Sequence, residues 1–336
     1  MKRWSVALAT GLLLWFGSAA AQHPSTEPVL SSSKGSGPGY PTKPIRLIVP
    51  FAPGGGNDLI ARIIGQRLTA MWGQAVIVDN RPGAGGNVAG EITARAAPDG
   101  YTAFQFNIAN TIAPSMYKDL RYDPIKDFAP VTQIAATPFI VVVPPGVPVK
   151  TTADLIAVGK QKPGQWSYGS SGIGGATHLA MELFKVMTGT DFVHVPYGGG
   201  GPALNDVIAG RIQILFAAPA AGLPHIRSGK VRGIAASGTK RIALVPELPT
   251  IAEAGVSGYE SSAWYGLVLP ARTPAPIVSA LNSAVVRVLN ESDVEQKMAA
   301  NGMQIVASSP TEFSAFIREE IAKWARVVKV SKAVVN

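Results

Sequence analysis

Three consecutive glycines stand between an apolar run and an amphipathic pattern, in the segment Val49-Pro50-Phe51-Ala52-Pro53-Gly54-Gly55-Gly56-Asn57-Asp58. Glycines let successive main-chain N–H groups point into one concavity, and a helix that follows adds unpaired N–H groups and the positive end of its dipole. Such a loop binds a carboxylate without any cationic side chain. The alternative interpretation is a plain tight turn capped by Asn57 or Asp58, although a turn needs fewer glycines.

Further glycine-rich loops follow along the chain, and each leads toward a helical pattern: Gly83-Ala84-Gly85-Gly86-Asn87, residues 169–175 and residues 197–202. In an α/β protein the loops at the carboxyl ends of the strands meet at one crevice, so several helix N-termini are expected to converge there. Together these loops predict an anion site, whereas any one of them alone is equally consistent with a simple connection.

Enzyme motifs fail at specific positions. A dinucleotide fingerprint would need glycine at Val88 or Thr177, and a nucleophile elbow would need it at Ile173. His178 and Glu182 lie one helical turn apart, but no second histidine neighbours them, so a polar helix face is favoured over a metal site. The sequence therefore predicts no catalysis, no cofactor and no metal. A hydrolase built around Ser171 and His178 stays as an alternative hypothesis.

The elements that must position these loops alternate between short apolar runs and helical patterns, which is typical of an α/β fold with mostly parallel sheets. The expected strands are residues 46–49, 75–78, 101–105, 140–143, 166–169, 192–194, 212–216, 231–236 and 266–269. The expected helices are residues 58–72, 151–160, 176–187 and a C-terminal helix whose Ser309 and Glu312 form a capping box.

Two proline-rich joints, residues 143–148 and 269–274, divide this pattern. They predict a discontinuous first lobe of residues 42–142 and 266–336, and an inserted second lobe of residues 143–265. Two lobes joined in this way enclose a hinged cleft.

The N-terminus predicts export. Lys2 and Arg3 precede an apolar run that ends at Phe16, and the small residues Ala19-Ala20-Ala21 then form a cleavage site. Together these parts indicate a signal peptide over residues 1–21, cleaved after Ala21. Residues 22–41 are rich in Ser, Pro and Gly and are expected to form a flexible leader. The chain contains no cysteine, which excludes disulfides, a thiol nucleophile and a lipidated anchor. A free periplasmic protein is therefore expected.

The formal net charge of +9 raises the question whether the protein binds nucleic acid, but no run of three Lys or Arg residues occurs. The sequence instead predicts a solvated basic surface that mildly favours anions, and no nucleic-acid partner.

A series of motifs then resembles the Bug family, the periplasmic receptors of tripartite tricarboxylate transporters. The motifs are Pro50-Phe51-Ala52-Pro53-Gly54-Gly55 with Asp58, Asn80-Arg81-Pro82-Gly83-Ala84-Gly85-Gly86, Pro98-Asp99-Gly100-Tyr101-Thr102, residues 122–128, Tyr168-Gly169-Ser170-Ser171-Gly172 with His178-Leu179, and His194-Val195-Pro196-Tyr197. They cover residues 40–328 in order. The resemblance implies a type II periplasmic-binding-protein fold that closes around a ligand like a Venus flytrap.

The resemblance also implies the binding residues. In the family one ligand carboxylate is held in the first lobe by the Pro-Gly-Gly loop, which here is Phe51, Ala52, Gly55, Gly56, Asn57 and Asp58. The second lobe is implied to contribute Ser170, Ser171, Thr177, His178, Tyr197 and Gly198. Further candidates are Asn87 in the second glycine loop, and Asn107 and Asn110 just past a first-lobe strand.

One loop departs from the family. Relatives usually carry polar residues, including an Asp, after the strand at 212–216, whereas this chain reads Ala217-Ala218-Pro219-Ala220-Ala221. Because that loop often contacts the far end of the ligand, Ala218 becomes a candidate contact, and a ligand with a less polar distal part is the hypothesis. A dicarboxylate and an aromatic carboxylate both stay open.

The expected function is that of a monomeric receptor that captures a small carboxylate and delivers it to the membrane permease subunits of a tripartite tricarboxylate transporter. The alternative is a carboxylate sensor that presents its ligand to a membrane sensor kinase.

Overall fold

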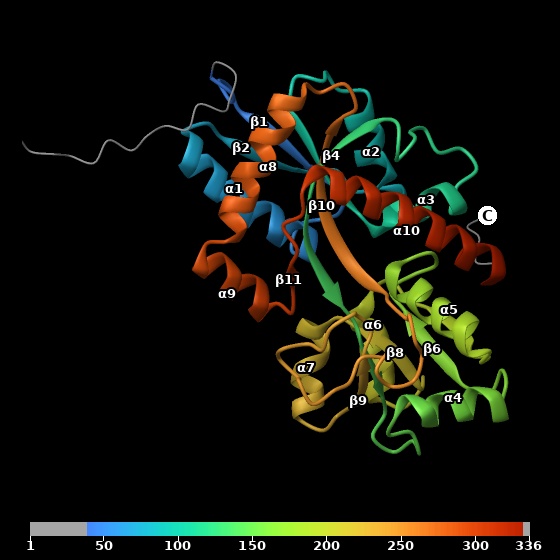
Figure 1. The fold of residues 1–336 in the computed structure, drawn as a ribbon. Helices are drawn as coiled ribbons and strands as arrows, with labels where there is room; N and C mark the ends of the chain where they lie inside the picture. The colour runs from blue at the N-terminus through green and yellow to red at the C-terminus, as the bar shows by residue number, and fades with distance from the viewer. Residues whose placement is uncertain (1–38, 332–336) are drawn as a thin grey trace, which may run out of the picture. The chain divides into compact units, whose positions relative to one another are not determined.

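A computed structural model describes residues 39–331 and has two β-sheets with helices packed on both faces (Figure 1). The α/β class predicted from the sequence is confirmed. The predicted signal peptide and nearly all of the predicted leader lie outside the described residues. Tyr40 already belongs to the folded part, because its hydroxyl donates to the carbonyl of Gly100 at 2.7 Å and its ring contacts Trp72 and Tyr101.

The first sheet has six strands in the order β11-β4-β10-β3-β1-β2. Their bounds are β1 (Ile45–Val49), β2 (Val76–Asn80), β3 (Thr102–Asn107), β4 (Phe128–Pro138), β10 (Ser262–Pro270) and β11 (Gln304–Ile305). The helices associated with it are α1 (Gly56–Trp72), η1 (Ala84–Gly86), α2 (Asn87–Ala94), α3 (Ile108–Met116), α8 (Ala275–Leu289), α9 (Ser292–Ala300) and α10 (Pro310–Ser331).

Side-chain alternation in its strands fills two cores. Leu47 and Ala103 pack with α1, α8 and α9 on one face, whereas Ile48 and Phe104 pack with α2, α3 and α10 on the other. The predicted capping box of α10 is confirmed, because the Glu312 N–H donates to Ser309 Oγ at 3.2 Å and the Ser309 N–H to Glu312 Oε2 at 2.8 Å.

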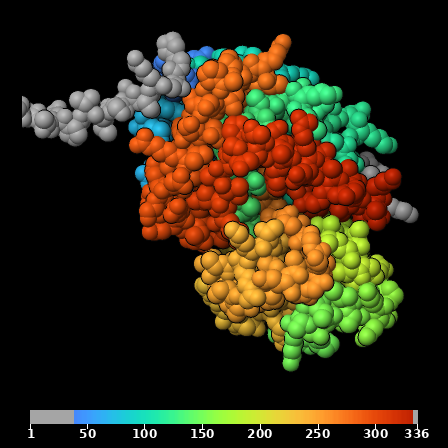
Figure 2. All heavy atoms as spheres, in the orientation of Figure 1, coloured from blue at the N-terminus to red at the C-terminus, as the bar shows by residue number. Residues whose placement is uncertain are grey.

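The second sheet has five strands in the order β7-β6-β8-β5-β9. They are β5 (Ile140–Val143), β6 (Ser167–Ser170), β7 (Val193–Pro196), β8 (Ile214–Ala217) and β9 (Arg232–Ala236), with helices α4 (Thr152–Gln161), α5 (Ala176–Thr188), α6 (Gly200–Ile208) and α7 (Pro219–Arg227). On the face shown in Figure 2, the red C-terminal helix covers the first sheet, and the green to yellow segments of the second sheet gather beside it.

Both sheets are mixed, whereas mostly parallel sheets were expected. β1, β2 and β3 pair in parallel, as do β6, β7 and β8, but β4, β10 and β11 join the first sheet antiparallel and β5 pairs antiparallel with β8 and β9. β4, β5 and β10 are the strands next to the points where the chain passes between the sheets, so their direction is set by the crossing rather than by a βαβ connection. The short β11 pairs with β4.

The chain passes between the sheets at two neighbouring segments. β4 ends at Pro138 and β5 begins at Ile140, and the chain returns through Ser261 into β10. Ser237 bonds to both crossings, because its hydroxyl accepts from the Phe139 N–H at 2.7 Å and its carbonyl accepts from the Ser261 N–H at 2.9 Å. The predicted lobe boundaries at 142/143 and 265/266 fall inside β5 and β10.

Candidate functional site

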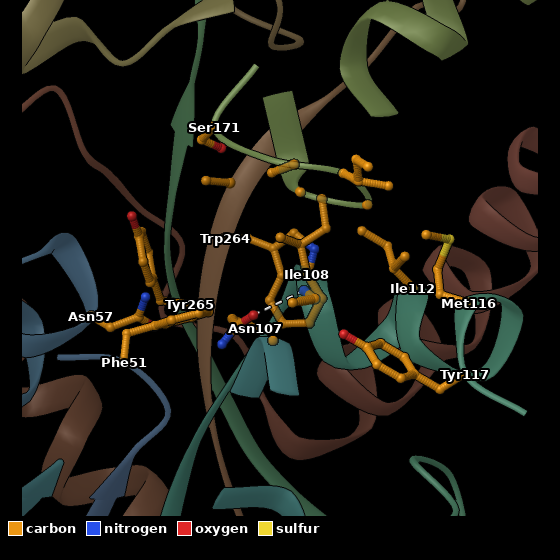
Figure 3. A pocket seen from close by; sticks show the side chains of 17 residues that line it. Phe51, Asn57, Asn107, Ile108, Ile112, Met116, Tyr117, Ser171, Trp264 and Tyr265 are labelled. Atoms are coloured by element: carbon orange, nitrogen blue, oxygen red, sulfur yellow. Dashed lines mark hydrogen bonds between the residues drawn. The ribbon is translucent and has the colours of Figure 1, made fainter. Parts of the chain in front are cut away.

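A cavity of about 300 Å³ opens where loops of the two sheets face each other (Figure 3). Its walls come from both sheets: Phe51, Asn57, Gly85, Asn107, Ile108, Ala109, Ile112, Met116, Tyr117, Ala263, Trp264 and Tyr265 from the first, and Ser171, Ile173, Gly174, Gly175 and Ala176 from the loop after β6. None of these residues is an Asp, Glu, Lys, Arg or His. An acid bound here therefore has only main-chain groups and neutral side chains as partners.

The first of these partners is the N-terminus of α1. Its N-cap, Gly55, has no side chain, so the N–H groups of Gly56, Asn57 and Asp58 have no capping side chain. Asn57 also carries a side-chain oxygen, Oδ1, that is buried without a hydrogen-bond partner. A Cβ on Gly56 would lie 2.6 Å from the Tyr265 hydroxyl, so only glycine lets this tyrosine pack against the start of the helix.

Asp58 holds this loop in place. Its carboxylate accepts from the Gly54 N–H at 3.0 Å, from Arg62 Nε at 2.9 Å and from Asn80 Nδ2 at 3.1 Å. Asn80 Nδ2 also donates to the carbonyl of Phe51 at 2.9 Å. The hydrogen bond from Arg62 is the largest cause that holds the pKa of Asp58 below its ordinary value. Asp58 is therefore a positioning residue. Because the Gly54 N–H donates to it, that N–H is not available to a ligand.

Replacing Asp58 tests that role. Asp58→Ala removes the acceptor of three donors, so the loop from Pro50 to Gly56 loses its shape; we expect ligand affinity to fall at least about 10-fold, which corresponds to about 1.4 kcal/mol. Asp58→Asn keeps a carbonyl oxygen and is expected to retain more affinity than Asp58→Ala. Titration calorimetry on both variants measures the difference. Equal affinities in the wild-type protein and Asp58→Ala would contradict a positioning role.

Asn107 forms the middle of the cavity wall. It ends β3 and caps α3, where its Oδ1 accepts from the Ala109 N–H at 2.9 Å and its own N–H donates to Asn110 Oδ1 at 3.0 Å. Its remaining group, Nδ2, is buried without a partner. Asn110 and Asn87 both bond to the hydroxyl of Tyr122, at 3.0 and 2.8 Å, so their polar groups stabilise the wall from behind.

The second helix N-terminus at the cavity belongs to α5. Its N-cap is also a glycine without a side-chain cap, Gly175, and Gly174, Gly175 and Ala176 all line the cavity. The loop before it is braced from inside, because the Gly174 N–H donates to His178 Nδ1 at 3.0 Å and Ser171 bonds to Thr177 Oγ1 through its N–H at 2.9 Å. Two uncapped helix N-termini, one from each sheet, therefore share one cavity.

Behind the α5 loop lies a stack of three rings. The ring centroids of His178 and His194 are 3.9 Å apart, those of His194 and Tyr168 are 4.9 Å apart, and His194 Nε2 bonds to Ser170 Oγ at 2.7 Å. Burial, with a smaller effect of the Lys185 ammonium, lowers the pKa of His178 to about 4. Burial and the neighbouring His178 lower the pKa of His194 to about 4 as well.

These histidines predict an acid-sensitive loop. Below pH about 6.5 the unfolded chain binds protons that the folded histidines do not, so the free energy of unfolding falls as the pH drops from about 6.5 toward 4 and levels off below that. We expect a loss of at least about 2 kcal/mol, measured by urea unfolding at several pH values. Protonated His178 can no longer accept from the Gly174 N–H, so ligand affinity falls in the same range.

His178→Asn is the control for this prediction, because the Asn side chain keeps an acceptor near the position of Nδ1 but does not titrate. We expect it to bind ligand at neutral pH and to lose less stability than the wild-type protein on acidification. An unchanged pH dependence in this variant would rule out His178 as the sensitive group.

Of the sequence-predicted site residues, Phe51, Asn57, Asn107 and Ser171 line the cavity. Ala52, Gly55, Gly56 and Asp58 lie beside it in the same loop, and Ser170, Thr177, His178, Asn87 and Asn110 lie behind its walls in the bonds described above. Tyr197 donates to Asp206 Oδ2 at 2.7 Å, and neither Tyr197 nor Gly198 is part of the lining. Ala218 caps α7, whose Pro219 lies against Gly302 instead of the cavity. The roles of all these predicted residues as ligand contacts stay predictions.

The sequence reading missed the apolar part of the lining. Ile108, Ile112 and Met116 recur every four residues on α3, and Trp264 and Tyr265 come from β10. The helical spacing of the apolar residues after Asn107 is a sequence signal that predicts the α3 residues of the lining. Ile173, which breaks the nucleophile-elbow motif, also lines the cavity.

The hydrolase hypothesis needs Ser171 paired with His178. Ser171 Oγ instead bonds to Thr177 Oγ1 at 3.0 Å, and His178 Nδ1 accepts a hydrogen bond from the Gly174 N–H.

Over residues 39–331, no group of three or more acidic, Cys or His residues is placed to hold a metal ion. Within that range, too, no helix is both long and apolar enough to span a bilayer.

Comparisons with known proteins agree on one family. The family model described as tripartite tricarboxylate transporter family receptor matches residues 60–332. Protein BugT of Bordetella pertussis is 34% identical over 296 residues, which are 88% of this chain and 91% of BugT.

Solved structures agree with the sequence matches. R. palustris Rpa4515 with adipate is 37% identical with a TM-score of 0.76, and the match covers 88% of this chain and 100% of that one. The periplasmic binding protein BugD is 29% identical with a TM-score of 0.73, over 88% of this chain and 99% of that one. The predicted periplasmic-binding-protein fold is thus confirmed. The chain belongs to the tripartite tricarboxylate transporter receptor family, whose members are solute-binding receptors and not enzymes.

Proposed function

We propose that this protein is exported to the periplasm, captures a small carboxylate in the cavity between its two sheets, and delivers it to the membrane permease subunits of a tripartite tricarboxylate transporter. The family membership supports a receptor role, and the relative Rpa4515 was solved with adipate. Presentation of the same ligand to a sensor kinase would use the same capture step and differs only in the partner.

One observation carries the proposal: the uncapped N-termini of α1 and α5 line one cavity that has no charged side chain. A helix N-terminus offers unpaired N–H donors and the positive end of the helix dipole, and hydrogen bonds to an ionised acceptor are about twice as strong as neutral ones. A carboxylate satisfies donors that otherwise depend on water. Its negative charge is then stabilised without a cation.

The same arrangement gives a reason for closure. The α1 N–H groups belong to the first sheet and the α5 N–H groups to the second, so an acid bound on α1 gains further hydrogen bonds only when the second lobe approaches it. We assign one lobe to each sheet, with the predicted boundaries at 142/143 and 265/266 moved to the chain crossings near Phe139 and Ser261. Ser237, which bonds to both chain crossings, lies where such a hinge is expected.

Matched acids and amides test the proposal. Titration calorimetry with benzoate, hexanoate and adipate, each beside its carboxamide, is expected to show binding of at least one acid and at least about 10-fold weaker binding of the corresponding amide. Small-angle scattering is expected to report a smaller radius of gyration with the bound acid. Amides that bind as tightly as their acids would contradict carboxylate capture.

A further inference from the structure

The cavity is polar at one end and apolar at the other. Figure 3 shows Asn57 and Phe51 at one end, Asn107 between the two ends, and Ile112, Met116 and Tyr117 at the other. The unpaired atoms Asn57 Oδ1 and Asn107 Nδ2 lie at the polar end and in the middle. Toward the far end of α3, the Tyr117 hydroxyl is the polar side-chain group of the lining.

The apolar end is built on one face of α3. Ile108, Ile112 and Met116 lie four residues apart, so their side chains stack along a stripe of about 12 Å. This stripe offers a ligand dispersion contacts and a dry surface, and no partner for a charge. The indole of Trp264 lies beside it with its Nε1 turned away, because that N–H donates to Glu320 Oε2 at 2.8 Å.

The opposite lobe adds an apolar side chain of its own. Ile173, in the loop before α5, lines the cavity and leaves 57% of its surface exposed, the second-largest exposed fraction among the large apolar side chains of the described chain. Covering an exposed isoleucine with an apolar ligand removes apolar surface from water and so favours binding. Closure onto an apolar ligand body would bury it.

A second carboxylate at the apolar end would lose its water and gain only the Tyr117 hydroxyl as a side-chain partner. Burying a charge with so few partners costs far more free energy than burying a methyl group at the same place. The N–H groups at the start of α1 and α5 are the charge-compensating groups of the cavity, and the proposed function uses them for the first acid group.

We infer that the ligand is a monocarboxylate with an apolar body, aromatic or aliphatic, whose acid group lies at the start of α1 and whose body lies between the α3 stripe, Trp264 and Ile173. This inference rests on the proposed function and narrows its substrate class. A hydroxyl or carbonyl in the middle of the ligand is compatible with it, because Asn107 Nδ2 and Asn57 Oδ1 offer one donor and one acceptor.

Matched ligands separate this inference from the proposed function. 4-Methylbenzoate and terephthalate differ by a methyl group against a carboxylate at the far end, and hexanoate and adipate form the aliphatic pair. We expect the monoacid of each pair to bind at least about 10-fold more tightly, measured by calorimetry and by quenching of tryptophan fluorescence. The neutral 4-methylbenzamide is expected to bind at least about 10-fold more weakly than 4-methylbenzoate.

Each outcome decides one point. A diacid that binds as tightly as its monoacid overturns the inference and leaves carboxylate capture standing. An amide that binds as tightly as 4-methylbenzoate overturns carboxylate capture itself. Absence of binding by both monoacids at millimolar concentration, in a protein that is folded by circular dichroism, also overturns the inference.

A pair of variants tests the contact with Ile173. Ile173→Lys places a cation on the side of the cavity formed by the loop before α5. It is expected to reduce the preference for 4-methylbenzoate over terephthalate at least about 5-fold. Ile77→Lys is the matched control, because Ile77 is 54% exposed on β2 and is not part of the cavity lining. An unchanged preference in Ile173→Lys would remove Ile173 from the ligand contact and contradict the proposal.

Discussion

Asn57→Asp is expected to weaken carboxylate binding at least about 100-fold while the protein stays folded. The substitution changes one side-chain group for an isosteric one and places a negative charge in the cavity at the second residue of α1. Two carboxylates about 5 Å apart at an effective dielectric constant of about 20 repel each other by about 3 kcal/mol, and each 1.4 kcal/mol changes affinity tenfold. The new carboxylate also competes for the N–H groups of α1.

The stability of Asn57→Asp, unlike its ligand affinity, is expected to stay the same or to rise slightly. An acidic side chain in the first turn of a helix is favourable by about 0.3–1 kcal/mol, so thermal unfolding is expected at the same or a slightly higher temperature. Asn290→Asp, an exposed position at the end of α8, makes the same change in net charge and is expected to leave affinity unchanged. Retained affinity in Asn57→Asp would mean that the acid group binds elsewhere.

Glu320→Leu is expected to destabilise the protein by about 3–5 kcal/mol, the largest stability effect predicted for this chain. Glu320 is buried on α10, and its Oε2 accepts from Trp264 Nε1 at 2.8 Å and from Trp324 Nε1 at 2.9 Å. It also pairs with Lys323, whose Nζ lies 2.8 Å from Glu260 Oε2. Leucine leaves two buried indole N–H groups without an acceptor and removes one partner of the lysine.

Two further variants calibrate this effect. Glu320→Gln keeps a side-chain oxygen for the indoles and is expected to lose only about 1–2 kcal/mol. Glu319→Leu, at the adjacent exposed position, is expected to change stability by no more than about 0.5 kcal/mol. Denaturant unfolding followed by tryptophan fluorescence measures all three. Because Trp264 also lines the cavity, Glu320→Leu is expected to weaken ligand binding too; unfolding at the same denaturant concentration as Glu319→Leu would contradict this account.

The polar end of the site follows from local sequence. The order strand, glycine loop, helix at residues 45–72 is a short-range pattern, and the structure has this order, with the uncapped N-terminus of α1 beside the cavity. The same holds for residues 167–188. Local rules suffice there because glycine spacing and helix periodicity act within one turn of the chain.

Trp264 reaches the apolar end from β10, through contacts between distant residues that no local pattern specifies. α3 was missed because Pro114 and several polar residues interrupt its apolar run, and β4 carries prolines at Pro130 and Pro138 that weaken a strand pattern. The contact between Gly56 and Tyr265 joins residues that are far apart in the sequence. Asp58 and His178 have residue types suited to ligand binding, and their side chains accept hydrogen bonds from the N–H groups of Gly54 and Gly174, four residues earlier in the chain.

A crystal structure with 4-bromobenzoate tests the central claim most directly, because the anomalous signal of bromine fixes the orientation of the ligand. The account predicts a carboxylate oxygen within about 3.2 Å of a main-chain nitrogen at Asn57 or Asp58, the other oxygen toward the start of α5, and the bromine beside Ile112 and Met116. An acid group at the α3 end, with the segment from Gly54 to Asp58 facing away from the ligand, would contradict it.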